Sequence, residues 1–268
     1  MHTKPTIYVC PPTSFTLAYE INTWMDTTNQ IDTAVAIQQW QILCDTLIQA
    51  GTDVKPIAGN LYPDSVFIAN AGLIINDTFI LSRFRFKERQ REESVWQELF
   101  GKEGYTVIQP PEKHYFEGAG DALFFRNHLI GGTGFRGTKN TYNWIEKTQP
   151  ISTLPVELVD PHFYHLDTCF CPLDDSTALI YPGAFSKKSF DDIKALGGTL
   201  IEVSEEEAHR FACNAIAIQK HIILPSHNPK TATQLQKNGY TPFFVEMAEY
   251  IKSGGAAKCC TLSPYRGS

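Results

Sequence analysis

The sequence lacks clusters of basic residues and long apolar segments, and both absences narrow the range of partners. Its 29 Asp and Glu residues outnumber its 23 Lys and Arg residues, for a net charge of -6, and no stretch gathers the positive charge that nucleic-acid binding requires. No apolar run reaches membrane-spanning length, and the opening MHTKPTIYVCPPTSF lacks the regions of a signal peptide. We therefore expect a cytoplasmic protein with neither nucleic-acid nor membrane partners.

Paired cysteine spacings are also lacking. The cysteines are odd in number and follow no disulfide framework, so we expect reduced thiols, at least one of them reactive. The seven positions are Cys10, Cys44, Cys169, Cys171, Cys213, Cys259 and Cys260.

No low-complexity linker divides the chain, and glycines and prolines separate elements rather than domains. With 43% hydrophobic residues over 268 positions, the chain can bury one large core. We predict a single domain over residues 1–268.

Helical patterns alternate with pairs of β-rich segments along the whole chain. Residues 32–51 repeat apolar residues at helical spacing and stop at Gly51, and Ser204 with Glu207 forms a capping-box pattern, in which Glu207 reaches back to the cap amide. Further helices are expected in residues 88–101, 189–196, 230–239 and 244–255, and β-rich pairs in 66–84, 121–135, 163–182 and 212–225.

These units recur at similar intervals without sequence identity. Counted from Phe67, Asp121, His165, Phe211 and Cys259, their starts are separated by 54, 44, 46 and 48 residues. Such a period indicates a divergent repeat array, and we predict an α/β ring of small blades.

The segment YHLDTCFC could carry catalysis or bind a metal. On a strand, His165 and Asp167 point to one face, where they can act as general base and cation holder or simply form a solvated face. His165 with Cys169 and Cys171 could ligate zinc, but no fourth ligand is evident, and two small buried strand residues explain these cysteines better.

Three further polar residues are candidates for contacts with a ligand. Glu117 and Asp121 flank two glycines that let backbone approach a ligand, although ordinary hairpins share this pattern. Asn70 interrupts an apolar strand, either as a substrate contact or as a strand-end turn.

The segment GGAAKCC offers a nucleophile near the chain end. Small residues and a lysine precede Cys259, which suits a reactive thiol. The alternative is that Cys259 and Cys260 are both buried strand residues.

Taken in order, these motifs resemble the pentein or amidinotransferase superfamily of guanidino-modifying enzymes across essentially the whole chain. That resemblance implies a five-bladed α/β propeller with ββαβ-type units, a central site, a single catalytic domain and no metal or organic cofactor. The motifs that carry it are FIANAG, FEGAGDAL, HLDTCFCPL, FACNA and GGAAKCCTL.

The resemblance also implies roles for residues. It makes Cys259, rather than Cys260, the nucleophile and His165 the general acid/base, while Glu117 and Asp167 hold the guanidinium by paired charge-assisted hydrogen bonds. We add Asp121 to the expected substrate contacts because it accompanies Glu117 in the same motif.

Within the superfamily, the segments look most like the arginine dihydrolase branch, which converts arginine to ornithine, ammonia and carbon dioxide. That branch has asparagines matching Asn70 and Asn22, where arginine deiminases and dimethylarginine dimethylaminohydrolases usually place an aspartate at the former. Arg89 and Arg136 match contacts to the substrate carboxylate, or are solvated surface residues. The branch usually reads ERQGEE where this chain has ERQREE, so Arg91 in place of glycine could reshape a loop at the entrance.

Several functions stay open at this point. Arginine deiminase and dimethylarginine dimethylaminohydrolase are the alternatives within the class, an amidinotransferase is a further one, and a non-catalytic binding protein is the alternative outside it. The expected partner is a small guanidino compound such as arginine, and a homo-oligomer remains open.

Overall fold

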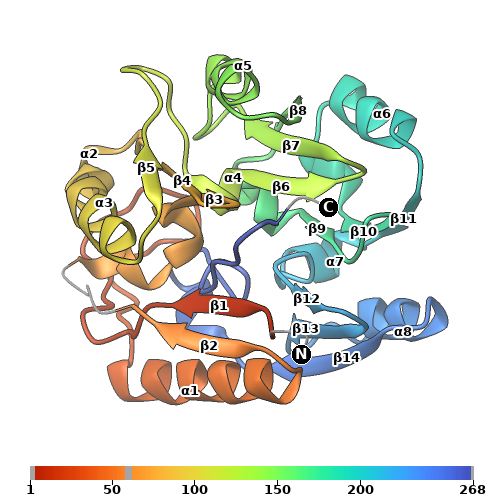
Figure 1. Ribbon diagram of the computed structural model, residues 1–268. Helices are drawn as coiled ribbons and strands as arrows, with labels where there is room; N and C mark the ends of the chain where they lie inside the picture. Colours follow the sequence, from red (N-terminus) through yellow and green to blue (C-terminus); the bar gives the residue numbers. More distant parts are fainter. Residues whose placement is uncertain (1–3, 58–61, 267–268) are drawn as a thin grey trace.

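The computed structural model describes residues 4–57 and 62–266, whose strands form five small sheets arranged as a ring (Figure 1). This arrangement confirms the predicted α/β propeller. The strands are β1 Thr6–Val9, β2 Asp53–Pro56, β3 Gly72–Ile75, β4 Thr78–Leu81, β5 Thr106–Ile108, β6 Ala122–Phe125, β7 His128–Thr133, β8 Ser152–Glu157, β9 Phe170–Pro172, β10 Thr177–Ile180, β11 Thr199–Glu202, β12 Ile216–Ile218, β13 His221–Pro225 and β14 Thr241–Val245.

Four of the sheets share one pattern. An antiparallel hairpin is followed by a helical crossover to a third strand that pairs in parallel with the second strand of the hairpin. The turn between β6 and β7 has positive φ at Arg126 and Asn127, the backbone that tight two-residue hairpins require. Each unit is therefore a ββαβ blade.

The fifth blade joins the two ends of the chain. Strands β1 and β2 pair in parallel around helix α1, and the C-terminal segment, antiparallel to β1, takes the place of the first strand of the blade. There, Tyr8 and Leu262 exchange both backbone hydrogen bonds, at 2.8 and 3.0 Å. The last unit thus closes the ring, which allows a residue near the chain end to face its centre.

Most expected helices are present, with some changes in length. Asp32 caps α1, which ends before Gly51 at φ +100°, and only residues 248–251 of the 244–255 segment are helical. The helices are α1 Thr33–Gln49, α2 Lys87–Gln90, α3 Glu92–Lys102, α4 Gly118–Asp121, α5 Lys139–Thr148, α6 Lys187–Ala195, α7 Glu205–Ala208, α8 Pro229–Lys237 and α9 Ala248–Ile251, with 3₁₀ turns η1 Pro63–Val66, η2 Ile68–Ala71, η3 Pro161–Phe163, η4 Leu166–Thr168 and η5 Pro182–Ala184.

One local expectation is wrong, and a second position has an ordinary backbone. Ser204 does cap α7, but the Glu207 carboxylate accepts hydrogen bonds from the backbone N–H groups of Lys230 and Thr231, at 2.8 and 2.7 Å, and so caps the next helix, α8. Arg91 between α2 and α3 has φ −67° and ψ −21°, an ordinary helical backbone, so this position does not need glycine.

The segments expected to begin the β-rich pairs are helical turns instead. Asn70 lies in η2, Asp167 lies in η4, and His165 is the residue that precedes η4, so none of them is on a strand. A strand would send alternate side chains to opposite faces, whereas a tight turn before the first strand can present its polar side chains at the ring centre.

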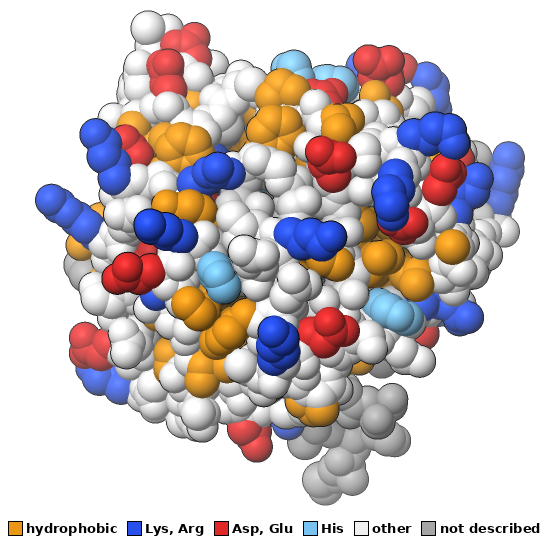
Figure 2. Space-filling view, turned by 90° about the horizontal axis from the view of Figure 1, so that it is seen from above, with side chains coloured by type: hydrophobic (Ala, Val, Ile, Leu, Met, Phe, Trp, Pro, Cys, Tyr) orange, Lys and Arg blue, Asp and Glu red, His pale blue; other side chains and the backbone are white. Residues whose placement is uncertain are grey.

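Charge on the surface is mixed. On the face seen in Figure 2, basic and acidic side chains are interspersed, without a large patch of either sign. Within the described residues, no helix has the length and apolar character needed to cross a membrane.

Closure of the ring predicts an effect on stability. Leu262 is fully buried at the closing contact, so we expect Leu262→Ala to lower the free energy of unfolding by about 2–5 kcal/mol, measured by urea denaturation. Ile48→Ala is the control because Ile48 is 52% exposed on α1, and its effect should stay within about 0.5 kcal/mol. Equal small effects for both variants would show that the closing contact is not a stability determinant.

Candidate active site

Polar residues from all five blades meet at the centre of the ring, each on the turn before the first strand of its blade. Two contacts tie these turns together: the backbone N–H of Ala69 donates to the carbonyl of Cys259 at 3.1 Å, and the side chain of Asn214 donates to the carbonyl of Asp167 at 3.0 Å. The side chains brought together in this way are Asn70, Glu117, Asp121, His165, Asp167, Asn214 and Cys259.

Cys259 is surrounded by acceptors and a fixed amide. Its thiol donates to Asp167 Oδ2 at 3.3 Å, and Asn214 Nδ2 donates to its sulfur at 3.1 Å. The Cys259 side chain is only 2% exposed. Burial, and next the charge of Asp167, raises the pKa of this thiol well above its usual value. The unliganded protein therefore holds a neutral thiol rather than a thiolate.

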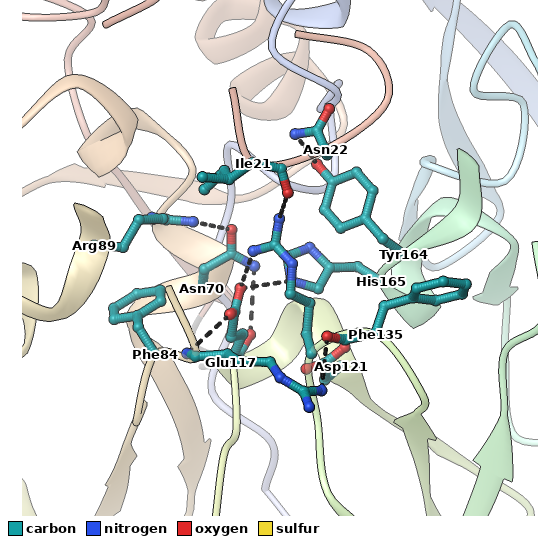
Figure 3. A network of polar contacts seen from close by, with 12 residues as sticks. Ile21, Asn22, Asn70, Phe84, Arg89, Glu117, Asp121, Phe135, Tyr164 and His165 are labelled. Carbon is teal, nitrogen blue, oxygen red and sulfur yellow. Dashed lines mark hydrogen bonds and ion pairs between the residues drawn. The ribbon is translucent and has the colours of Figure 1, made fainter. Parts of the chain in front are cut away.

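His165 and Glu117 form a buried acid–base pair (Figure 3). His165 Nε2 lies 2.8 Å from Glu117 Oε2, the oxygen that also accepts from Arg136 Nη1 at 2.8 Å. Burial alone would raise the pKa of Glu117, but Arg136 and the hydrogen bond to His165 hold that pKa well below its usual range. Burial lowers the pKa of His165, so the imidazole is neutral near pH 7.

Arg136 is the cation that keeps Glu117 ionised. Besides Glu117, its guanidinium donates to the carbonyl of Ile21 at 2.8 Å and lies over the rings of Phe86 and Tyr164, at 4.6 and 4.7 Å from their centroids. A planar guanidinium is thus already held at this carboxylate in the unliganded protein.

Asn70 is oriented by a second buried arginine. Arg89 pairs with the Glu92 carboxylate through Nε and Nη2, at 2.7 and 2.9 Å, and donates from Nη1 to Asn70 Oδ1 at 2.9 Å (Figure 3). Because arginine can only donate, Oδ1 of the amide must face Arg89. The NH₂ group of Asn70 therefore faces the Glu117 carbonyl, 3.3 Å away. Neither Arg89 nor Arg136 is a surface residue.

A small cavity connects these groups. It has room for about one water molecule. Burial raises the pKa of Asp64, one of its lining residues, to about 6, and Oδ1 of that carboxyl has no hydrogen-bond partner among the described residues. The lining is Ile21, Asn22, Met25, Asp64, Phe67, Asn70, Arg89, Arg136, Tyr164, His165, Ser253, Gly255 and Cys259.

Asn22 lies at the outer edge of this cavity. Its amide donates to Tyr164 Oη at 3.3 Å and to the carbonyl of Ser253 at 3.1 Å, and its Oδ1 accepts from the backbone N–H of Trp24 at 2.9 Å. These contacts hold the segment that carries Ile21 and Asn22 between the cavity and a more open hollow that Arg136 and Tyr164 also line, and this hollow is the entrance to the site.

Asp121 differs from the other expected substrate contacts. It is not in the cavity lining, and neither of its carboxyl oxygens has a hydrogen-bond partner among the described residues. Burial, followed by the charge of Glu117, raises the pKa of Asp121 well above its usual value. This carboxyl is therefore neutral.

The structure separates the residues considered for zinc. The thiols of Cys169 and Cys171 donate to backbone carbonyls, at 3.5 Å to Leu166 and 3.2 Å to Ala215. His165 is engaged with Glu117 instead. These two cysteines are buried side chains next to and within β9.

Lys258 does not point toward the small cavity. It lines a larger hollow of about 200 Å³ together with Phe124 and Tyr265, and Cys259 is not part of that lining. This hollow contains neither the thiol of Cys259 nor the imidazole of His165. We place the chemistry in the smaller cavity for that reason.

Three participants were not identified from the sequence. Asn214 lies inside the FACNA motif, but the motif alone predicts no role for this residue. Asp64 lies shortly before Asn70 in the chain, and Tyr164 directly precedes His165. A signal for Asn214 exists in hindsight, because it occupies in the fourth blade the turn position that Asn70 and His165 occupy in theirs.

The state of the thiol predicts how it reacts. Because the pKa of Cys259 is raised, the thiolate fraction at pH 7 is small and grows about tenfold per pH unit below the pKa. We expect the iodoacetamide alkylation rate of the unliganded protein, corrected with a Cys259→Ser variant, to rise from pH 7 to 9.5 without levelling off. A plateau below pH 8 would mean that the resting site holds a thiolate.

Comparisons with known proteins agree with this geometry. Residues 11–266 match the profile of the eukaryotic N,N-dimethylarginine dimethylhydrolase family. The bifunctional arginine dihydrolase/ornithine cyclodeaminase AgrE of Nostoc sp. is 40% identical over 95% of this chain, which spans only 37% of AgrE. The dimethylarginine dimethylaminohydrolase of Mycobacterium tuberculosis is 38% identical over 94% of this chain and 83% of its own length.

A solved structure extends the likeness to the fold. The N-terminal domain of ArgZ, an arginine dihydrolase of cyanobacteria, superposes with a TM-score of 0.94 at 36% identity, over 98% of both chains. The resemblance to guanidino-modifying hydrolases and their arginine dihydrolase branch is thereby confirmed. The chain belongs to the N,N-dimethylarginine dimethylhydrolase family.

Proposed function

We propose that this chain, as one catalytic domain over residues 1–268, is a cysteine hydrolase that converts L-arginine to ornithine, ammonia and carbon dioxide. The observation that carries the proposal is the meeting of a thiol with an imidazole–carboxylate pair and an oriented amide at one cavity. AgrE is named as an arginine dihydrolase, and the ArgZ domain has been solved with substrate bound in a cysteine-to-serine mutant.

Recognition of a guanidinium is supported by Arg136. Its guanidinium is bound to Glu117 and packed between the Phe86 and Tyr164 rings, so this carboxylate already accepts the group that a substrate would bring. Since the cavity has room for about one water, the substrate guanidinium must displace Arg136. The released Arg136 can then pair with the substrate carboxylate, the role that the resemblance gives it.

The other end of the substrate has matching groups. Asp64 Oδ1 and the carbonyl of Ile21 are acceptors beside the cavity, suited to a substrate α-ammonium. Asp167 Oδ1 also has no partner among the described residues and can accept from the guanidinium next to Cys259.

The bound cation activates the nucleophile. A positive guanidinium next to Cys259 and Asp167 lowers the pKa of the thiol by direct charge attraction, which counters the effect of burial. The thiol passes its proton to the neutral imidazole of His165, and the thiolate attacks the central carbon. A C–N bond then breaks, and ammonia leaves with the proton that His165 received. Water then attacks the thiouronium intermediate, and His165 takes the proton of that water, which gives citrulline and frees the thiol.

A second round on citrulline completes the reaction. The same thiol attacks the ureido carbon, a second ammonia leaves, and water releases a carbamate of ornithine, which loses carbon dioxide. The ureido oxygen is neutral and can only accept a hydrogen bond. Asn70 offers it an NH₂ donor because Arg89 holds the Oδ1 of that amide, whereas an aspartate would offer only acceptors.

The test is a product assay on purified protein with L-arginine. We expect ornithine and ammonia in a ratio of about one to two, because both terminal nitrogens leave through one thiol site. A Cys259→Ser variant should form no product. Citrulline as the end product would instead assign the chain to the deiminase class, and product from Cys259→Ser would remove Cys259 from the mechanism.

Asn70 predicts a change of product. Asn70→Asp keeps the shape of the side chain but replaces the NH₂ donor by an acceptor, so we expect citrulline to accumulate while arginine consumption stays within about tenfold, or about 1.4 kcal/mol in the barrier. Asn70→Ala is the matched control, which removes both functions and should slow both steps. Unchanged ornithine formation by Asn70→Asp would contradict the proposed role of the amide.

Dimethylarginine hydrolysis is the second candidate because the family profile and the mycobacterial relative carry that name. It requires the cavity to accept two methyl groups on the leaving nitrogen. Asymmetric dimethylarginine offered beside arginine distinguishes the two, since a dihydrolase should prefer arginine in kcat/KM.

A further inference from the structure

A cluster of potential metal ligands lies beside the active-site entrance and has no part in the chemistry above. Asp160, His162 and His209 each offer a ligand atom, and these three atoms lie within 4.8 Å of one another. Asp160 and His162 come from the segment after β8 that leads directly to His165, and His209 ends helix α7.

Hydrogen bonds already orient the donor atoms. His209 Nδ1 lies 3.0 Å from the carbonyl of Glu205. Because a carbonyl only accepts, Nδ1 carries a proton, and in the neutral imidazole Nε2 is then the nitrogen with the lone pair, which is the arrangement that metal-binding histidines use.

The other two ligands are spaced as a metal would hold them. His162 Nδ1 and Asp160 Oδ1 are 3.0 Å apart, near the separation of about 3.3 Å between two ligands on tetrahedral zinc with bonds of about 2.0 Å. A cation can replace the proton that these two atoms share. Side-chain exposures of 44% for His162 and 26% for Asp160 leave both ligands accessible from solvent.

Aromatic packing holds the two histidines together. The His162 and His209 rings lie 5.2 Å apart, and the Trp24 ring lies 5.7 Å from the first and 6.2 Å from the second. Trp24 Nε1 also donates to the carbonyl of His162 at 2.9 Å. Trp24 belongs to the segment whose Ile21 and Asn22 line the cavity.

We propose that Asp160, His162 and His209 form a site for a zinc-class divalent cation, with water as the fourth ligand. Two imidazole nitrogens and one carboxylate oxygen are a donor set that suits Zn²⁺, Co²⁺ and Ni²⁺. Occupancy ties α7 to the segment before His165, and through Trp24 to the segment over the entrance. The site is separate from Cys259 and does not depend on the proposed reaction.

The test uses Cys259→Ser protein, so that the catalytic thiol cannot bind the metal. Zn²⁺ binding is measured by calorimetry, and Co²⁺ binding by visible absorption and by quenching of Trp24 fluorescence, which a Trp24→Phe variant assigns. We expect one cation per chain, and at least tenfold weaker binding after His209→Gln. His128→Gln is the matched control, because His128 also has its Nδ1 against a backbone carbonyl, at 2.8 Å from Arg126, but lies outside the cluster.

Each outcome bears on the proposal. Weaker cation binding by His209→Gln with unchanged binding by His128→Gln supports the site. An Asp160→Asn variant should lose cation affinity in the same way. Equal affinity in all variants, or no binding of either cation, would overturn it. Circular dichroism of each variant checks that weaker binding does not come from unfolding of the protein.

Discussion

The site depends on one buried charge, the ionised carboxylate of Glu117. Such a charge is costly to remove from water unless partners compensate it. Here Arg136 and His165 both lie 2.8 Å from the same oxygen, while the other oxygen accepts from the backbone N–H of Arg85 at 3.4 Å. The charge on Glu117 orients the imidazole and makes the centre of the ring a place where a guanidinium is stable.

The ring brings distant parts of the chain to this charge. Each blade uses its strands for packing and leaves the turn before its first strand free to carry a polar side chain, so Glu117, His165 and Cys259 meet although they are far apart in sequence. The electrostatic balance is incomplete without substrate, because burial keeps Cys259 neutral and Asp121 protonated. In the proposed function, a cationic substrate supplies the missing positive charge, which links recognition to activation of the nucleophile.

Much of this arrangement could be predicted from the sequence. Intervals of 44 to 54 residues between unit starts revealed the blades, because repeating units must be similar in length even when their residues differ. The joint order of weak motifs gave the family, and it led to Cys259 rather than the adjacent Cys260. Helix α1 was evident from its apolar spacing and its Gly51 stop.

The errors have physical causes. The turns carrying Asn70 and Asp167 look like strands in sequence because short apolar runs fit both structures. Glu207 caps a neighbouring helix rather than its own, a tertiary contact that no local pattern contains. Asn214 was missed because its partners Asp167 and Cys259 come from other blades, and Arg136 bound to Glu117 could be seen only in three dimensions.

The proposed function requires that the thiol of Cys259 form a covalent bond to the guanidino carbon of the substrate. The most direct measurement is mass spectrometry of protein quenched with acid within milliseconds of mixing with L-arginine, followed by peptide mapping. We expect an adduct on Cys259 with the mass of arginine less ammonia, formed before citrulline or ornithine appears and absent in Cys259→Ser. Full turnover without any adduct, or an adduct mapped to another residue, would contradict it.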